Sequence, residues 1–177
     1  FPPASTPRCR KRATACSGCD HLTEDPMPET ELCRLEVEGP VAFLTLDRTD
    51  SYNALNEQII SEIVDVLSWT SSRSVGETGD LMAPGGSANL RALVIRSEGK
   101  HFCAGADINM MRDAGGKTEE ENRADSERLD MLFHGLWSHP CFTIACVQGV
   151  ALGGGAGLVA CSDHVIAEPG TKIALSE

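Results

Sequence analysis

The feature that most constrains the fold is a spacing of apolar residues that switches between the two-residue period of strands and the longer period of helices. The first such stretch, residues 33–38, alternates apolar and polar positions. Gly39-Pro40 then interrupts the pattern, and residues 41–46 are mostly apolar. Two short strand-like runs separated by turn residues predict a β-hairpin.

The rest of the chain alternates helical and strand-like segments. Apolar residues at helical spacing follow Asn56, whose side chain can cap a helix, and they predict a helix over 56–69. Beyond it, the pattern predicts strands over 91–96, 142–147 and 164–167, helices over 119–137 and 156–162, and a turn over 149–155. Strands that alternate with helices predict an α/β fold whose parallel strands open onto a site at their carboxyl ends.

The composition fits one globular domain. Of 177 residues, 41% are hydrophobic and 23% are charged. No apolar run approaches the ~18 residues that a membrane-spanning helix needs. The formal net charge is −11, and all 26 acidic residues follow Cys19. Because such an acidic surface repels phosphate groups, we expect neither nucleic acid nor a membrane as a partner.

The N-terminal segment differs from the rest in composition. Residues 1–19 contain no acid and are rich in basic residues, Ser, Thr, Ala and Pro. This composition resembles the remnant of an organellar transit peptide; the alternative is an untranslated leader before Met27. We therefore expect residues 1–31 to be a disordered leader and residues 32–177 to form the folded domain. Within it, the Gly- and Ser-rich residues 71–89 are expected to be a mobile surface insertion.

The eight cysteines could indicate disulfides or a metal site. Cys16, Cys19 and His21 could begin a zinc site, but no second closely spaced pair completes the four ligands. We therefore expect no metal and a reducing compartment. Four cysteines lie in apolar or Gly/Ala-rich segments and are expected to be small buried residues: Cys103, Cys141, Cys146 and Cys161.

The run Gly153-Gly154-Gly155 lies between a predicted strand and a predicted helix. Backbone without side chains can approach a ligand closely there and present N–H groups to an oxyanion. The alternative is that the glycines only let the strand pack tightly on the helix. The sequence has neither the Gly-Lys-Ser/Thr of a Walker loop nor the spacing of a Rossmann loop, so nucleotide phosphate binding is disfavoured.

Several motifs together are more specific than the glycine turn alone. They are Leu46-Asp-Arg, Asn53-Ala-Leu-Asn, Phe102-Cys-Ala-Gly-Ala-Asp-Ile, Val147-Gln-Gly-Val-Ala-Leu-Gly-Gly-Gly and Ala174-Leu-Ser-Glu. In this order and spacing, the chain resembles the crotonase (enoyl-CoA hydratase/isomerase) superfamily from about Leu32 to Glu177, apart from the insertion. The resemblance implies an α/β core of ββα units wound into a superhelix, truncated here after the second active-site motif.

The resemblance also implies the chemistry of the site. Members of the superfamily polarise a thioester carbonyl between two backbone N–H groups, which fall on Ala104 and Gly154. Preorganised donors of this kind stabilise an enolate oxygen by about 3–4 kcal/mol each. The substrate would be an acyl-CoA, with CoA as part of the substrate and no separate cofactor.

Two segments are expected to contact the CoA part. The first lies within residues 48–55, where the family usually has a proline and a basic residue, and Thr49 and Ser51 depart from that pattern. The second is the loop before the predicted helix cap at Asp107. The residues that correspond to CoA-binding positions are Ser51, Tyr52, Ala54, Ala104, Gly105, Ala106 and Asp107.

The acid/base residues distinguish branches of the superfamily. Hydratases with the full pattern carry two glutamates, and the first of these positions is Gly157 here. Glu177 takes the second position and would be the sole general acid/base, which requires a pKa raised toward neutrality. This arrangement resembles the branch that hydrates methylglutaconyl- or isohexenylglutaconyl-type CoA esters in leucine and isoprenoid breakdown. An enoyl-CoA isomerase is the alternative, because some isomerases also lack one glutamate.

The remaining polar residues are expected to be structural. Asp107 would cap the helix after its loop, and Asp163 would lie at a helix-to-strand junction. Met110 and Met111 would pack a pocket wall. Neither a metal nor a catalytic role is expected for four histidines: His101, His134, His139 and His164.

The chain ends directly after the Ser-Glu motif, whereas crotonases continue with a region that closes the acyl pocket and builds the trimer. The competing hypothesis is therefore an inactive fragment that retains only CoA-binding or scaffold function. The fragment is expected to be poorly stable, because strands such as 142–147 would lose their cover. The full-length family member would be a homotrimer or hexamer. The leader suggests the mitochondrial matrix, with cytosol or peroxisome as alternatives.

Overall fold

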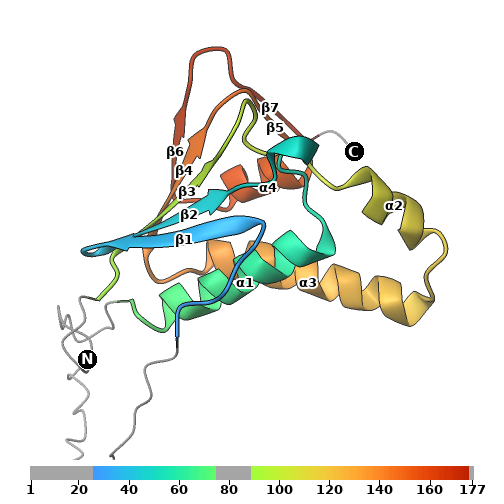
Figure 1. Cartoon of the computed structure of the whole chain (residues 1–177), viewed down its shortest axis with the longest axis horizontal. Coiled ribbons are helices and arrows are strands. Elements are labelled where there is room, and N and C mark those ends of the chain that lie inside the picture. Colours follow the sequence, from blue (N-terminus) through green and yellow to red (C-terminus); the bar gives the residue numbers. More distant parts are fainter. Residues whose placement is uncertain (1–25, 75–88, 176–177) are drawn as a thin grey trace, which may run out of the picture.

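The computed structural model of the chain describes residues 26–74 and 89–175 and has an α/β architecture (Figure 1). Five strands form one sheet in the spatial order β1-β2-β3-β4-β6. Their bounds are β1 Cys33–Glu38, β2 Val41–Leu46, β3 Ala92–Ser97, β4 Phe142–Val147 and β6 His164–Ala167. The predicted α/β fold is confirmed, with all five strands within one residue of their predicted bounds.

The strand directions determine where a site can form. β1 and β2 form the predicted antiparallel hairpin, in which Cys33 pairs with Leu46 and Glu38 pairs with Val41. β2, β3, β4 and β6 are parallel neighbours. Their carboxyl ends therefore lie at one edge of the sheet, and the loops that leave this edge can meet there.

Helices α1 (Glu57–Ser71) and α3 (Glu119–Trp137) lie side by side along the sheet (Figure 1). Asn56 caps α1 as predicted, because its Oδ1 accepts a backbone N–H three residues later at 3.0 Å. α3 begins with a capping box formed by Thr118 and Glu121. The apolar side chains buried in the shared core include Leu44, Ile59, Ile63, Leu93, Ile95, Leu132 and Leu136.

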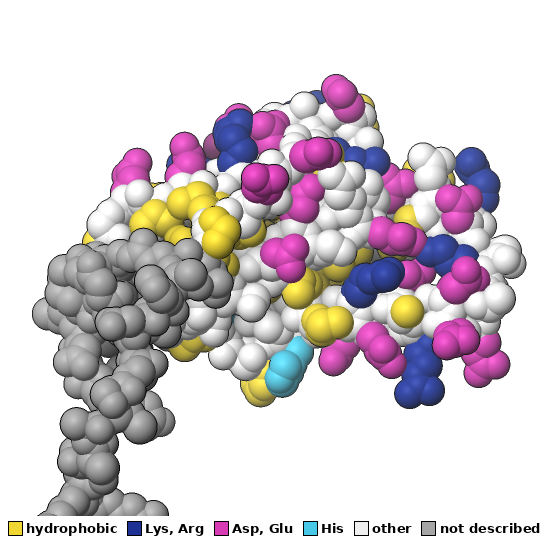
Figure 2. All heavy atoms as spheres, turned by 60° about the horizontal axis from the view of Figure 1, so that its bottom comes forward, with side chains coloured by type: hydrophobic (Ala, Val, Ile, Leu, Met, Phe, Trp, Pro, Cys, Tyr) yellow, Lys and Arg dark blue, Asp and Glu magenta, His cyan; other side chains and the backbone are white. Residues whose placement is uncertain are grey.

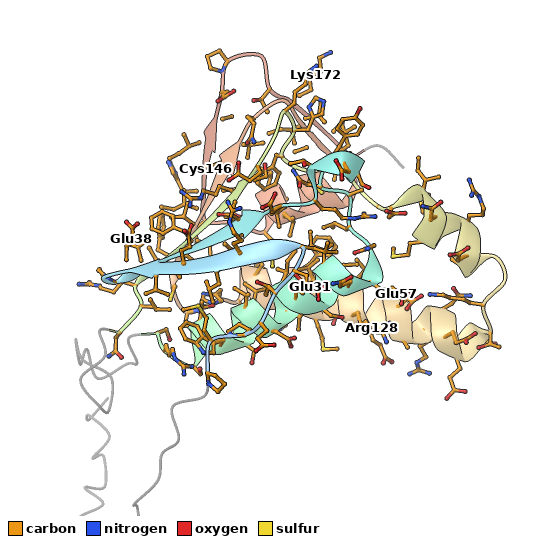
Figure 3. All side chains as sticks on the ribbon, in the orientation of Figure 1. Glu31, Glu38, Glu57, Arg128, Cys146 and Lys172 are labelled. Atoms are coloured by element: carbon orange, nitrogen blue, oxygen red, sulfur yellow. The ribbon has the colours of Figure 1, made fainter. Side chains whose placement is uncertain are left out.

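Charged side chains are spread over the face that carries α1 and α3 (Figure 2). Lys117 contacts Glu57 of α1 and lies 2.6 Å from Asp125 of α3, so it links the two helices. Glu57 and Arg128 mark the two helices in Figure 3. No helix within residues 26–74 and 89–175 is long and apolar enough to cross a membrane.

Short elements complete the fold near the carboxyl edge of the sheet. A helix, α2 (Ile108–Ala114), follows Asp107 as expected. The turn predicted over 149–155 is wrong in part, because it contains a strand and the start of the next helix. Three short elements were not predicted from the sequence: the 3-10 turn η1 (Thr49–Ser51), β5 (Val150–Leu152) and β7 (Lys172–Ala174). The helix predicted over 156–162 is α4, which spans Gly154–Ala160. β5 and β7 pair in parallel as a separate two-stranded sheet.

The predicted insertion begins too early. α1 continues through Ser71, because the helical backbone hydrogen bonds extend to that residue. Leu90 then donates its N–H to the carbonyl oxygen of Arg73 at 2.7 Å, which joins the two ends of the connection. Residues 75–88, the remainder of the predicted insertion, lie outside the described residues.

The folded part also begins earlier than predicted. Glu62 on α1 is 8% exposed, and its Oε2 accepts the backbone N–H groups of Glu31, Leu32 and Cys33 at 2.9–3.1 Å. These bonds attach the segment before β1 to α1, so Glu31 does not belong to a free leader. Residues 1–25 lie outside the described residues.

The cysteine predictions are confirmed in part. Cys103 and Cys141 are buried, and burial raises the pKa of each thiol to about 11. Cys146 and Cys161 are only half-buried. In the part of the chain that the structure describes, no three His, Cys, Asp or Glu side chains are grouped to hold a metal ion.

Candidate functional site

Three loops meet at the carboxyl edge of the sheet. They follow β2, β3 and β4 in the chain. Leu55 and Ala106 form a parallel bridge, with the N–H of Leu55 donating to the Gly105 carbonyl at 2.7 Å. Cys103 and Ala151 form a second parallel bridge. Three of the sequence motifs, at residues 53–56, 102–108 and 147–155, are therefore brought together in space.

Asn53 fixes the first loop against the second. It is 1% exposed, and its Oδ1 accepts the N–H of Arg48 at 2.8 Å. Its Nδ2 donates to the carbonyls of Glu98 and His101, each at 2.9 Å. The φ of Asn53 is +55°, in the left-handed region that Asn tolerates better than most residues. An Asn in a polar loop is a sequence signal for a turn, but no local pattern predicts the hydrogen bonds of Asn53 to Glu98 and His101.

Two glycines allow the second and third loops to touch through their backbones. Gly105 has φ +98°, and a Cβ atom there would lie 2.9 Å from the carbonyl oxygen of Leu152. A Cβ atom at Gly155 would lie 2.5 Å from the carbonyl oxygen of Cys103. Both contacts are closer than side chains permit. At Gly155, the packing alternative for the glycine run is therefore correct.

The backbone N–H groups of the second and third loops differ in whether they are free to bind a ligand. Ala104 donates its N–H to the carbonyl of Tyr52 at 3.0 Å, so this donor is not free for a ligand as the resemblance implied. Ala106 is exposed, and its N–H has no acceptor among the described residues. Gly154 is the first residue of α4, where an N–H has no acceptor within the helix. The available pair is thus Ala106 and Gly154.

Asp107 has a structural role in this arrangement. Its carboxylate accepts the N–H groups of Asn109 and Met110 at the start of α2, which confirms the predicted cap. It also lies 2.6 Å from the guanidinium of Arg48, and Asp107 is 6% exposed. The hydrogen bond from Arg48 lowers the pKa of the Asp107 carboxyl. Because these partners occupy the carboxylate, it is a poor candidate for binding CoA.

The residues expected to contact CoA in the first loop have different exposures. Ser51 ends η1 and is half-buried, while Ala54 is 8% exposed. Tyr52 is 59% exposed and has φ +52°. Its ring meets the ring of His101 edge-on at a centroid distance of 5.4 Å. Tyr52 is therefore the most accessible of the three.

Phe133 of α3 lies against the glycine turn. A Cβ atom at Gly157 would lie 2.6 Å from Cε1 of this ring, and one at Gly154 would lie 3.9 Å from Cζ. A Cβ atom at Gly154 would also lie 2.9 Å from Cδ1 of Leu55. The side chains beside the turn are thus apolar. Phe133 lies within the helix predicted over 119–137, but its contact with α4 could not be predicted, because no local sequence pattern indicates it.

The proposed acid/base Glu177 lies outside the described residues. The strand that precedes it is part of the site, since the carbonyl of Ala174 in β7 accepts the N–H of Gly153 at 2.9 Å. Gly153 precedes α4 with φ +48°. β7 is therefore hydrogen-bonded directly to the glycine turn.

A polar cavity of about 430 Å³ adjoins these loops and lies between the start of α1 and α2. Its charged residues include Arg48, Asp107, Glu57 and Lys117. These four groups are already joined as the ion pairs Arg48–Asp107 and Lys117–Glu57. The cavity thus offers a ligand few unpaired charges.

Comparison with known proteins agrees with this α/β core and its glycine turn, which together define a crotonase-type domain. The sequence profile of the enoyl-CoA hydratase/isomerase family matches residues 36–177. The chain therefore belongs to the enoyl-CoA hydratase/isomerase family.

Two relatives illustrate the extent of the similarity. YhaR of Bacillus subtilis strain 168 is 30% identical over 146 residues, which cover 82% of this chain and 51% of YhaR. The enoyl-CoA isomerase/hydratase fer4 of Mycosarcoma maydis is 30% identical over 138 residues, which cover 77% of this chain and 47% of fer4. The chain spans about half the length of the curated relatives it matches.

Solved structures share the fold. An enoyl-CoA hydratase from Shewanella pealeana has 36% identity and a TM-score of 0.68, over 78% of this chain and 47% of that one. AtuE of Pseudomonas aeruginosa has 33% identity and a TM-score of 0.66, over 77% of this chain and 48% of that one.

Proposed function

We propose that the chain supplies the thioester-binding half of an enoyl-CoA hydratase, in which the carbonyl oxygen accepts hydrogen bonds from Ala106 and Gly154. The observation that carries this proposal is the pair of unpartnered backbone N–H groups on two adjoining loops at the carboxyl edge of the sheet. Membership of the enoyl-CoA hydratase/isomerase family supports it.

The chemistry follows from the charge that develops on the substrate. Adding water across the double bond of an enoyl thioester places negative charge on the carbonyl oxygen. Two fixed N–H donors aimed at that oxygen stabilise it by roughly 3–4 kcal/mol each, and no side chain is needed. Ala104 has a different role in this proposal: its bond to Tyr52 holds the second loop against the first.

Glu177 is the proposed general acid/base, and it acts alone. The position of the other family glutamate is Gly157, and the ring of Phe133 lies so close that any side chain there requires the ring to move. One carboxylate with this turn supports assignment to the branch that hydrates methylglutaconyl- or isohexenylglutaconyl-type CoA esters. A single carboxylate can also move a proton between two carbons, so an enoyl-CoA isomerase is the second candidate.

The CoA part of the substrate is proposed to contact the first loop. Tyr52 is the best-placed contact, because its ring is exposed next to the second loop. Ser51 and Ala54 would contribute mainly through their backbone, since both are at least half-buried. As a family member, the full-length protein is proposed to assemble as a homotrimer or hexamer.

Substitution of Gly154 tests the oxyanion role. Proline fits the first position of a helix and removes the N–H donor, whereas alanine adds a Cβ atom and keeps the donor. In the protein that contains this chain, Gly154→Pro should lower the hydration rate of a 2-enoyl-CoA by about a hundredfold relative to Gly154→Ala. Equal rates for the two variants would remove Gly154 from the site.

A further inference from the structure

We propose that Phe133 is the specificity-determining residue of the site, and that its ring forms the apolar wall against which the acyl carbons next to the thioester pack. This inference rests on the proposed function, because it concerns what lies beside a carbonyl bound at Gly154. It goes further by naming the side chain that decides which acyl groups fit.

The position of the ring comes from two glycines on α4. Gly154 and Gly157 are three residues apart, so they lie on one face of the helix. The ring of Phe133 covers that face, since a Cβ atom at Gly157 would lie 2.6 Å from Cε1 and one at Gly154 would lie 3.9 Å from Cζ. A larger residue at position 157 would push the ring away. Glycine at 157 is therefore what allows the ring to approach the turn.

Phe133 is half-buried, so part of its surface is accessible. Leu55 also lies next to Gly154, with its Cδ1 2.9 Å from a Cβ atom there, but Leu55 is only 1% exposed. Phe133 is therefore the accessible apolar side chain of the two. We expect an acyl group that extends from a carbonyl at Gly154 to pack against the accessible part of the Phe133 ring. A charged group on the carbons nearest the thioester would lose water there without gaining a partner.

Binding of acyl-CoA esters of different bulk tests the inference. The affinities to be measured by calorimetry are those for CoA, a short straight-chain acyl-CoA and an acyl-CoA branched next to the thioester. Phe133→Ala should shift the preference toward the branched ester by about tenfold and leave CoA binding unchanged. Phe133→Leu should shift the preference in the same direction but by less. Because leucine fills more of the space than alanine, this variant serves as the test if Phe133→Ala does not fold.

The control is Met131→Ala, because Met131 lies on the same helix, is 52% exposed and faces the groove between α1 and α3. It should leave the preference unchanged. If folded Phe133 variants bind acyl-CoA with the unsubstituted preference, the inference is wrong while the proposed function stands. If the unsubstituted protein binds none of the CoA compounds, the proposed function itself fails.

Discussion

The guanidinium of Arg48 lies 2.6 Å from the carboxylate of Asp107, and it also donates to the carbonyl of Ala54 at 2.9 Å. Arg48 follows β2, whereas Asp107 ends the loop after β3. One side chain therefore connects the loop that is proposed to contact CoA with the loop that carries Ala106. The side chains are 19% and 8% exposed, so water competes little for this pair.

Asp107→Asn should distinguish the contribution of the ion pair to stability from that of the helix cap. Asparagine is as good a cap as aspartate, so this variant keeps the start of α2 but loses the charge that faces Arg48. We expect a loss of about 2–3 kcal/mol in the free energy of unfolding, between the values for exposed and fully buried pairs. Asp107→Ala should lose about 1 kcal/mol more, because the cap is also removed. Urea denaturation measures both, and equal stability of Asp107→Asn and the unsubstituted chain would contradict the role of the pair.

The same pair predicts a pH dependence. The pKa of Asp107 is lower in the folded state, chiefly because of the hydrogen bond from Arg48. The folded state therefore holds the ionised form, and the stabilisation is present above the unfolded pKa of about 3.9. It is lost as the pH falls from about 4 through the lower folded value. The difference in melting temperature between the unsubstituted chain and Asp107→Asn should shrink over this range. A difference that stays constant down to the acid limit would exclude Asp107 as its source.

Asn53 should be one of the most sensitive loop positions. Asn53→Ala removes three hydrogen bonds and places alanine at φ +55°. With about 1 kcal/mol for each bond and about 1 kcal/mol for the conformation, we expect a loss of roughly 4 kcal/mol. Asn53→Gly relieves the conformation but still loses the bonds, so it should be destabilised less than Asn53→Ala. The reverse order in thermal unfolding would show that the conformation is not strained.

The effect of Gly157→Ala on the free energy of unfolding should depend on whether Phe133 is present. In the unsubstituted chain the new Cβ atom forces the ring of Phe133 aside, at a cost of about 1–3 kcal/mol that outweighs or cancels the helix preference for alanine. In a Phe133→Ala background the ring is gone, and Gly157→Ala should be neutral or stabilising by up to about 1 kcal/mol. A double-mutant cycle in urea measures this coupling. Additive effects would mean that the ring and position 157 do not interact.

β6 is an outermost strand of the five-stranded sheet, and it should promote self-association. All four residues of β6 are exposed, and Ile166 is 55% and Val165 36% exposed. Exposed apolar edge strands tend to pair with other chains. We expect sedimentation velocity to show concentration-dependent association of the chain, and Ile166→Lys to reduce it. A chain that stays monomeric at all concentrations would contradict this expectation.

Local patterns predicted the elements that depend on nearby residues. The hairpin and the helix capped by Asn56 were predictable because the turn, the cap and the periodicity lie within a few residues of one another. β5 and β7 were not, because each has three residues and the paired residues, such as Val150 and Lys172, are 22 positions apart in the chain. For the same reason, local sequence patterns could not predict whether Ala104 or Ala106 has the available N–H donor. It depends on the carbonyl of Tyr52, a residue far away in the chain.

The strand connections also bear on how quickly the chain folds. Among the described strands, only β1 and β2 pair across a tight turn. Every other pair joins segments separated by a crossover, such as Val41 with Ala92 and Ala92 with Phe142. A tight hairpin forms in roughly 1–10 μs, whereas distant pairings must first close long loops. The hairpin is therefore free to form early, and the docking of β3 between β2 and β4 should limit the rate. The carboxyl edge that carries the site would then be completed only in the final stages of folding.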